Sequence, residues 1–253
     1  MQPEDLRRFF ENIAPLESFG AEAFQGDATV PQDLCNLVLV LALIFNDLND
    51  LQVAGEILRE AEPDPPKRKS REWGSWIAMD YHSFRLFAGI LHELLSVLAD
   101  NRTQLEHPFF VSITKQLSAG ARKAWASVVT ASDQAALPKD PLGKSLVYIR
   151  NKAASHYDPK AITLGYRHHF FESGRPDERG YVSRGVMPWE TRFYFADAAV
   201  QGLRQRNIPG SLRDVDLMEN VSKLLAQLLF ALMEIVCLFI QRRGQAFRLE
   251  PEP

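Results

Sequence analysis

The sequence has few cysteines and no net positive charge, and both features limit what the chain can be. Only two of its 253 residues are cysteine, Cys35 and Cys237, and each lies in a strongly apolar run. This placement indicates buried thiols in a reducing compartment, and it favours neither a disulfide nor a metal site. The formal net charge of −3 argues against a broad basic surface for long nucleic acid, but it is compatible with a local basic cleft.

We expect neither a secretory leader nor a membrane-spanning segment in this sequence. The first residues are acidic early and have no continuous apolar core, unlike a secretory signal. The run 34–45 is too short to cross a bilayer, and the run 221–240 is interrupted by Lys223, Gln227 and Glu234. Each charge at mid-bilayer depth costs about 2.5–3.5 kcal/mol on an insertion scale. We therefore expect a cytoplasmic protein without a membrane partner.

Sequence motifs of common enzyme classes do not occur either. The chain has no phosphate-cradling glycine loop, no Cys/His zinc spacing, no nucleophile elbow and no internal repeat. Its hydrophobic fraction of 46% and charged fraction of 24% are ordinary for a soluble globular protein. The chemistry must therefore be sought in individual side chains and their place in the fold.

Helical periodicity dominates the chain. It predicts a short helix at 4–13, longer ones at 31–61, 70–103, 108–136 and 140–158, a helical start at 161–171, a helix at 196–207 and a long last helix capped by Ser211. Short connections between such helices are typical of a bundle. We expect an all-α, antiparallel bundle of about five main helices. It would form a single domain over 1–253, with 1–30 as an N-terminal extension.

Residues 172–195 break this pattern. Glycines and prolines occupy turn positions there and precede an aromatic alternation, which predicts a small β-hairpin or irregular flap inserted between helices. The flap and the residues before it are basic, and a basic loop on a rigid scaffold could fold over a polyanionic ligand. The basic residues are His168, His169, Arg175, Arg179 and Arg184.

In the predicted helix at 140–158, a titratable residue falls on the side of the helix that should be buried. Asp140 and Pro141 suit its start, and the residue before Pro159 is disfavoured in a helix, so both ends are defined. His156 falls close to the apolar stripe of this helix, and Arg150 lies at the edge of the stripe. Because local and global signals disagree most often at functional sites, we expect this helix to carry the site.

This segment resembles the signature helix of the HEPN superfamily (higher eukaryotes and prokaryotes nucleotide-binding domains). The family motif is an Arg, usually a polar residue, then a few residues and a His, which Arg150, Asn151 and His156 match. Arg-to-His spacings also occur at 102–107 and 85–92, but without this context. The resemblance implies a bundle that pairs through the motif helix. It often implies an endoribonuclease that needs no metal or other cofactor, in a toxin or defence role that would add a partner antitoxin.

The residue chemistry agrees with such a role. His156 can take or give a proton near neutral pH, and Arg150 offers a fork of donors that matches a phosphate. Asn151 can hold phosphate or sugar, and Tyr157 can stack on a base, with Lys152 as a further substrate contact. Six residues at about 100° each place Arg150 and His156 roughly 120° apart around the helix. A second copy in an isologous homodimer would then complete the site.

Other interpretations stay open. His156 could be a core histidine satisfied by the backbone or by Asp47 or Asp50, which are candidate supporting partners of the site. The chain could also be a non-catalytic module that binds a nucleotide or a partner protein, or a purely structural one. Near the start of the second long helix, Trp73, Trp76 and Tyr81 could stack on a base, although aromatic residues at a helix end more often anchor the core.

Overall fold

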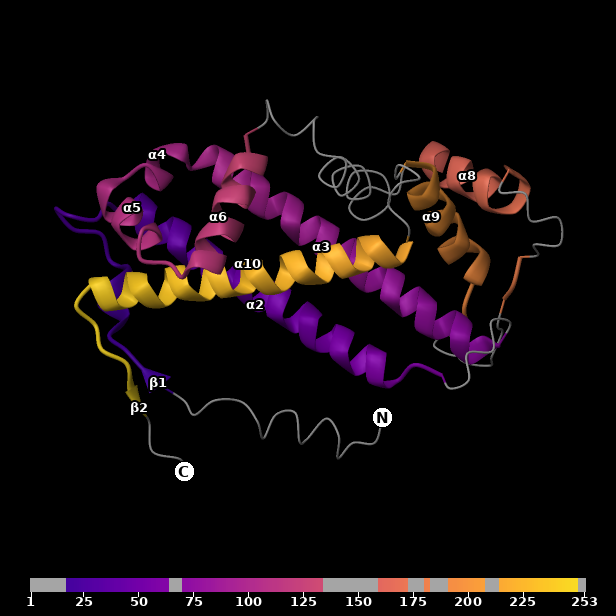
Figure 1. The fold of residues 1–253 in the computed structure, drawn as a ribbon, viewed down its shortest axis with the longest axis horizontal. Coiled ribbons are helices and arrows are strands. Elements are labelled where there is room, and N and C mark those ends of the chain that lie inside the picture. Colours follow the sequence, from indigo (N-terminus) through magenta and orange to yellow (C-terminus); the bar gives the residue numbers. More distant parts are fainter. Residues whose placement is uncertain are drawn as a thin grey trace. The chain divides into compact units, whose positions relative to one another are not determined.

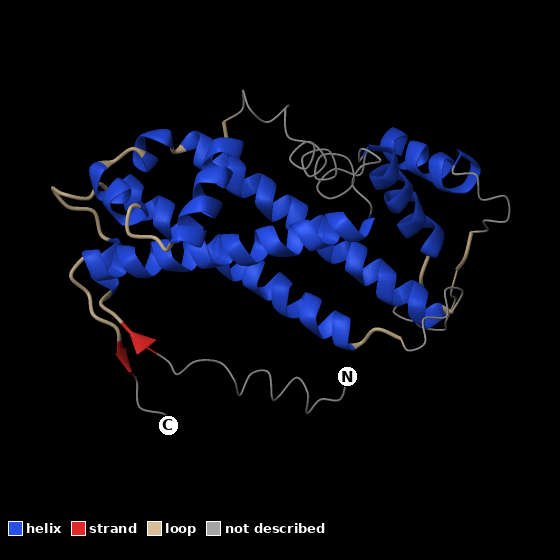
Figure 2. Ribbon diagram, in the orientation of Figure 1, coloured by secondary structure: helices blue, strands red, loops and turns tan. Residues whose placement is uncertain are grey.

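The computed structural model describes residues 17–63, 70–133, 159–172, 180–182, 191–207 and 214–249. Helices dominate these residues, and the only sheet within them has two short strands (Figure 2). The protein is therefore all-α, as the helical periodicity predicts. The expected helix at 4–13, the motif helix at 140–158 and most of the predicted flap lie outside the described residues.

Two long helices follow the predicted bounds closely (Figure 1). Helix α2 spans Gln32–Glu60 and α3 spans Arg71–Asp100, against predictions of 31–61 and 70–103. On α3 the predicted core positions are buried except for Ile77, which is partly exposed; the buried ones are Phe84, Ala88, Leu91, Leu95 and Leu98. Their spacing of three or four residues places them on one face of the helix.

The prediction of one continuous helix over 108–136 is wrong. A short helix α4 at Arg102–Leu105 precedes two separate helices, α5 at Pro108–Thr114 and α6 at Ala119–Ala131. Ser118 divides them because its hydroxyl accepts a hydrogen bond from the backbone N–H of Ala121 and so caps α6. The N–H and hydroxyl of Ser118 also donate to the carboxylate of Glu234, both at 2.7 Å. The apolar periodicity continues across the break between α5 and α6, so the sequence pattern alone does not reveal the break.

Helix α8, at Pro159–Arg167, packs against α9, at Tyr194–Asn207 (Figure 1). Between them in sequence, a single π-helical turn, η3 at His168–Glu172, extends α8. Helix α9 begins at Tyr194 and not at Ala196 as predicted. The aromatic residues Tyr194 and Phe195, assigned to the end of the flap, therefore belong to a helix.

The last helix, α10, spans Asp214–Arg242, and Gly244 follows it with a φ of 77°. This left-handed conformation suits glycine and is a common way to end a helix. The chain then returns as strand β2 at Arg248–Leu249, which pairs antiparallel with β1 at Glu17–Ser18 (Figure 1). The small sheet thus joins segments near the two ends of the chain, at a place the sequence did not indicate.

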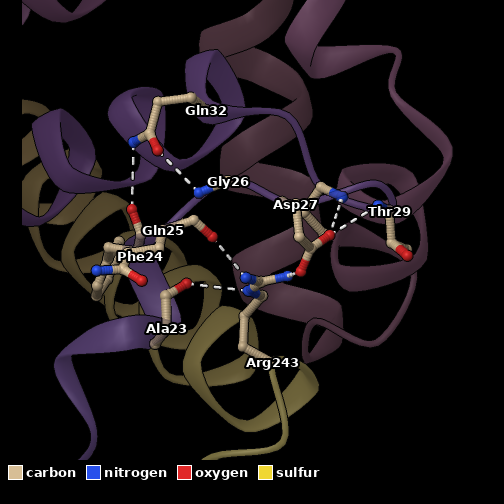
Figure 3. Close-up of polar contacts among 9 residues, drawn as sticks. Ala23, Phe24, Gln25, Gly26, Asp27, Thr29, Gln32 and Arg243 are labelled. Carbon is tan, nitrogen blue, oxygen red and sulfur yellow. Dashed lines mark hydrogen bonds and ion pairs between the residues drawn. The ribbon is translucent and has the colours of Figure 1, made fainter.

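Arg243 fixes the segment between β1 and α2, which includes the short 3₁₀ helix η1 at Ala21–Phe24. Its guanidinium donates to the carbonyl oxygens of Ala23 and Gln25 and to the carboxylate of Asp27 (Figure 3). Gln32, at the start of α2, also contacts this loop. Its side-chain amide accepts a hydrogen bond from the backbone N–H of Gly26 and donates one to the carbonyl oxygen of Phe24. These polar contacts explain how a loop without apolar periodicity keeps one conformation.

The chain divides into two compact units. The first comprises Met1–Asn49, Leu94–Asp133 and Val221–Pro253, and the second comprises Asp50–Glu93 and Gln134–Asn220. Helices α2 and α3 each contribute residues to both units. The single domain over 1–253 stays a prediction.

Among the described helices, α2 is long and apolar enough to cross a membrane by length and composition. The same test is passed by the core helix of a soluble protein. The first half of α2 contains fully buried residues, among them Leu34, Cys35 and Val38, while Leu39 and Leu43 are exposed. The cytoplasmic location stays a prediction.

Candidate functional site

The predicted catalytic and substrate-binding residues lie outside the described residues. These are Arg150, Asn151, Lys152, His156 and Tyr157. The two candidate supporting residues, Asp47 and Asp50, are described and have exposed side chains on α2. Their suggested contact with His156 therefore stays a prediction.

The second unit contains a pocket of about 230 Å³. Its walls come from α3, η3 and α9, together with Tyr181 in the described stretch 180–182. Aromatic side chains form much of the lining: Tyr81, Phe170, Tyr181, Tyr194 and Phe195. His169, Asp197 and Gln201 add polar atoms to it. An apolar hollow with a few polar groups is the usual form of a small-molecule site.

The position of η3 follows from close contact between α8 and α9. A Cβ atom added to Gly202 would lie 2.1 Å from the carbonyl oxygen of Gly165 and 2.9 Å from Cβ of His169. Only glycine permits this approach of the two backbones. His169 is consequently buried, at 5% exposure, beside the pocket.

The π-helical turn separates neighbouring aromatic residues. Phe170 lines the pocket, whereas Phe171 is 75% exposed. One-turn π-helical segments occur frequently at functional sites, because the extra residue reorients the side chains around it. The turn is held to α9 through Glu172, whose carboxylate lies 3.6 Å from Nδ1 of His168 and 3.8 Å from the guanidinium of Arg206.

Tyr194 joins the start of α9 to the start of α3. Its hydroxyl donates to the carbonyl oxygen of Arg71 at 3.1 Å and lies 3.1 Å from the hydroxyl of Ser75. Its ring lies so close to Gly74 that a Cβ at that position would be 2.8 Å from a ring carbon. The aromatic wall is therefore anchored by hydrogen bonds and by close packing.

Two arginines contact residues in or near the pocket lining. The Arg192 guanidinium lies 3.2 Å from the carboxylate of Asp197, which is a lining residue. The Arg85 guanidinium lies 3.2 Å from Nδ1 of His82, and a guanidinium can only donate, so the neutral imidazole is the acceptor. Burial lowers the pKa of His82, the charges of Arg85 and Arg192 lower it further, and the charge of Asp197 opposes them. Two arginines and one carboxylate therefore act on His82.

The three aromatic residues singled out on α3 have different roles. Trp73 and Trp76 stack with ring centroids 5.1 Å apart, and the Trp76 indole donates to the carbonyl oxygen of Leu58 at 2.7 Å. This contact ties α3 to the end of α2, as expected of a core anchor. Tyr81 lines the pocket.

Metal ligands do not gather in the described part of the chain, where no group of three or more His, Cys, Asp or Glu residues could hold a metal ion. The two cysteines form no disulfide: Cys35 is buried and Cys237 is partly buried. Burial raises the pKa of both thiols. The prediction of a buried thiol is confirmed for Cys35, whereas Cys237 is only partly buried.

Comparisons of the chain with protein-family models, curated proteins and solved structures found no match.

Most lining residues of the pocket were not singled out by the sequence. Phe170, Asp197 and Gln201 carry no motif, and Tyr194 and Phe195 were assigned to the flap. A helical projection starting at Tyr194 would have placed Asp197, Ala198 and Gln201 on the same face as Tyr194. That signal was obscured because Arg192–Phe195 alternates like a strand.

Proposed function

We propose that this chain is a HEPN-like, metal-independent endoribonuclease that acts as a cytoplasmic homodimer. Arg150, Asn151 and His156 would form the reacting site, with Tyr157 and Lys152 contacting substrate. The observation that carries the proposal is the Arg-Asn-x4-His sequence in an all-α protein. A toxin or defence role with a partner antitoxin belongs to the same proposal.

The boundaries of the neighbouring helices support this proposal. Helix α6 ends at Ala131 and α8 begins at Pro159, directly after the predicted end of the motif helix. A proline is tolerated in the first turn of a helix, so Pro159 can begin α8. The proline ring disfavours helical geometry for the residue before it, which would end the preceding predicted helix. The motif would thus lie near the C-terminal end of its own helix.

The reaction needs only groups on the protein and the RNA. His156 accepts the proton of the ribose 2′-hydroxyl, and the 2′-oxygen attacks the adjoining phosphorus. A 2′,3′-cyclic phosphate forms as the bond from phosphorus to the 5′-oxygen breaks, and that oxygen takes up a proton. Arg150 stabilises the charge that develops on the phosphate oxygens, because its planar fork donates two parallel hydrogen bonds.

The test is cleavage of a mixed-sequence RNA in the presence of a chelator, with DNA of the same sequence as substrate control. We expect His156→Ala to slow cleavage about 10²–10⁴-fold, the usual contribution of a general acid or base. Arg150→Ala should cost about 10²–10³-fold, as for other charge-stabilising donors. Lys160→Ala, an exposed cation on α8, is the matched control and should cleave normally.

Circular dichroism and light scattering must show that all variants remain folded and keep the native oligomeric state. Cleavage that survives both motif substitutions would place the active site elsewhere. DNA cleaved as fast as RNA would exclude attack by the 2′-hydroxyl.

The pocket favours a second candidate function. A non-catalytic module that binds a nucleotide would need an aromatic site next to cationic groups, and the second unit contains both. The absence of RNA cleavage by the native protein, together with nucleotide binding, would favour this alternative.

A further inference from the structure

The pocket in the second unit has the size of a single ring system. Its volume of about 230 Å³ is below the range of about 300–1,000 Å³ that is usual for drug-sized ligands. A folded peptide segment or a nucleic-acid duplex would not fit. One planar group in contact with the aromatic lining would fit.

The lining can recognise a planar ring that has hydrogen-bonding edges. Tyr81, Phe170 and Phe195 line the pocket with aromatic rings. A nucleobase can stack on such a ring with an affinity that depends little on which base it is. Asp197 offers acceptor atoms and Gln201 offers both donor and acceptor atoms. Asp197 already accepts a hydrogen bond from Arg192, and a heteroaromatic base could bond to its remaining acceptor positions and to Gln201.

The arginines beside the pocket suit the anion that accompanies a base. Arg192 contacts the lining residue Asp197, and Arg85 contacts His82, which follows the lining residue Tyr81 in sequence. Arg85, Arg192 and Asp197 all act electrostatically on His82, so two positive charges and one negative charge act on the same region of the unit. Arginine matches phosphate geometry with paired donors.

We propose that this pocket binds one nucleobase of the RNA substrate, and that Arg85 and Arg192 contact the adjoining phosphate. The proposal rests on the proposed function in assigning RNA as the ligand. It adds a base-binding subsite formed by residues of α3, η3 and α9, none of which belongs to the Arg150–His156 motif.

The first test is binding of the four nucleoside 5′-monophosphates to the full-length protein, measured by titration calorimetry in the presence of a chelator. We expect saturable binding of at least one nucleotide below about 5 mM. Ala198→Phe should weaken it at least about 10-fold, because Ala198 lines the pocket and the new ring would fill it. Ala196→Phe is the matched control: this residue is exposed on the same helix outside the lining, and binding should stay within about 2-fold.

A second pair of variants covers the case in which Ala198→Phe does not fold. Phe195→Ala removes a lining ring that is 37% exposed, and Phe171→Ala removes a ring outside the lining that is 75% exposed. We expect only Phe195→Ala to weaken nucleotide binding. Equal binding by Phe195→Ala and Phe171→Ala, or no binding of any nucleotide to the native protein, would overturn the proposal.

The phosphate contact is tested by comparing each nucleotide with its nucleoside. Arg85→Gln should weaken nucleotide binding about 10-fold and leave nucleoside binding unchanged. Arg71→Gln is the control, because the Arg71 side chain is 81% exposed on the same helix and is paired with Glu72. A loss of affinity that is equal for nucleotide and nucleoside would remove the phosphate from the proposal.

The pocket and the nuclease site can fail separately. We expect His156→Ala to bind nucleotides normally, since the proposed subsite is formed by residues of α3, η3 and α9. If nucleotides bind in the pocket but the native protein does not cleave RNA, the nuclease function is wrong and the binding site stands. If RNA is cleaved equally well by the native protein and by folded Ala198→Phe, the base subsite is wrong and the nuclease function stands.

Discussion

At the scale of single residues, Arg243 makes several polar contacts with one loop. Its side chain is only 12% exposed and bonds to two backbone carbonyls and one carboxylate (Figure 3). We expect Arg243→Ala to lower the free energy of unfolding by about 2–3 kcal/mol, since hydrogen bonds to charged groups contribute about 1.5–3 kcal/mol each and are not additive. Urea denaturation measures this loss. Arg242→Ala, at an exposed neighbouring position, should change stability by less than about 0.5 kcal/mol.

The same contact predicts a pH dependence. The hydrogen bond from Arg243 holds the pKa of Asp27 at about 2, below its ordinary value of 3.8, with help from the backbone N–H groups of Val30 and Thr29. A lowered folded-state pKa stabilises the fold while the group is ionised, so the contribution is complete above 3.8 and is lost as the pH falls towards 2. The stability difference between the native protein and Asp27→Asn should therefore shrink over this window. A difference that is independent of pH would contradict this assignment.

At the scale of elements, the contact between α8 and α9 depends on two glycines. An alanine at Gly202 would place its Cβ 2.1 Å from the Gly165 carbonyl oxygen. We expect Gly202→Ala to destabilise the protein by about 1–3 kcal/mol, the usual range for overpacking, and to disturb the buried residue His169. Thermal unfolding measures the effect.

Gly89 provides the opposite expectation within the same unit. It lies inside α3, and a Cβ added there would meet no atom of the described residues within 4 Å. Gly89→Ala should therefore stabilise the protein by about 0.5–1 kcal/mol, because alanine loses less backbone entropy than glycine in a helix. If Gly89→Ala and Gly202→Ala both destabilise the protein, the close approach of the two backbones at Gly202 is not the cause of the effect.

At the scale of the whole molecule, the proposed site requires two copies of the chain. If Arg150 of one copy acts with His156 of the other, mixing Arg150→Ala with His156→Ala chains restores one intact site in each mixed dimer. Random exchange should then return about a quarter of native RNA cleavage. The measurement is cleavage after co-refolding of equal amounts of the two variants. A mixture as inactive as its components would place both residues of the site in one chain.

The sequence predicts elements better than breaks between them. The bounds of α2 and α3 follow from long apolar periodicity, and α8 begins at the proline that marks a boundary. The break at Ser118 was missed because the apolar spacing continues across it, while the hydrogen bonds from Ser118 to Glu234 join residues more than a hundred positions apart. A contact of that kind has no local signature.

By itself, the sequence determined the helical class, the long helices and the motif Arg150-Asn151-x4-His156, because apolar period, caps and motif spacing are local properties. Only the tertiary structure decided which aromatic residues share a pocket, because Tyr81, Phe170 and Tyr194 lie on elements far apart in the chain. It also decided that glycines at 165 and 202 allow two backbones to touch. Such close approach depends on which helices pack together, and the periodicity of a single helix does not specify its partner.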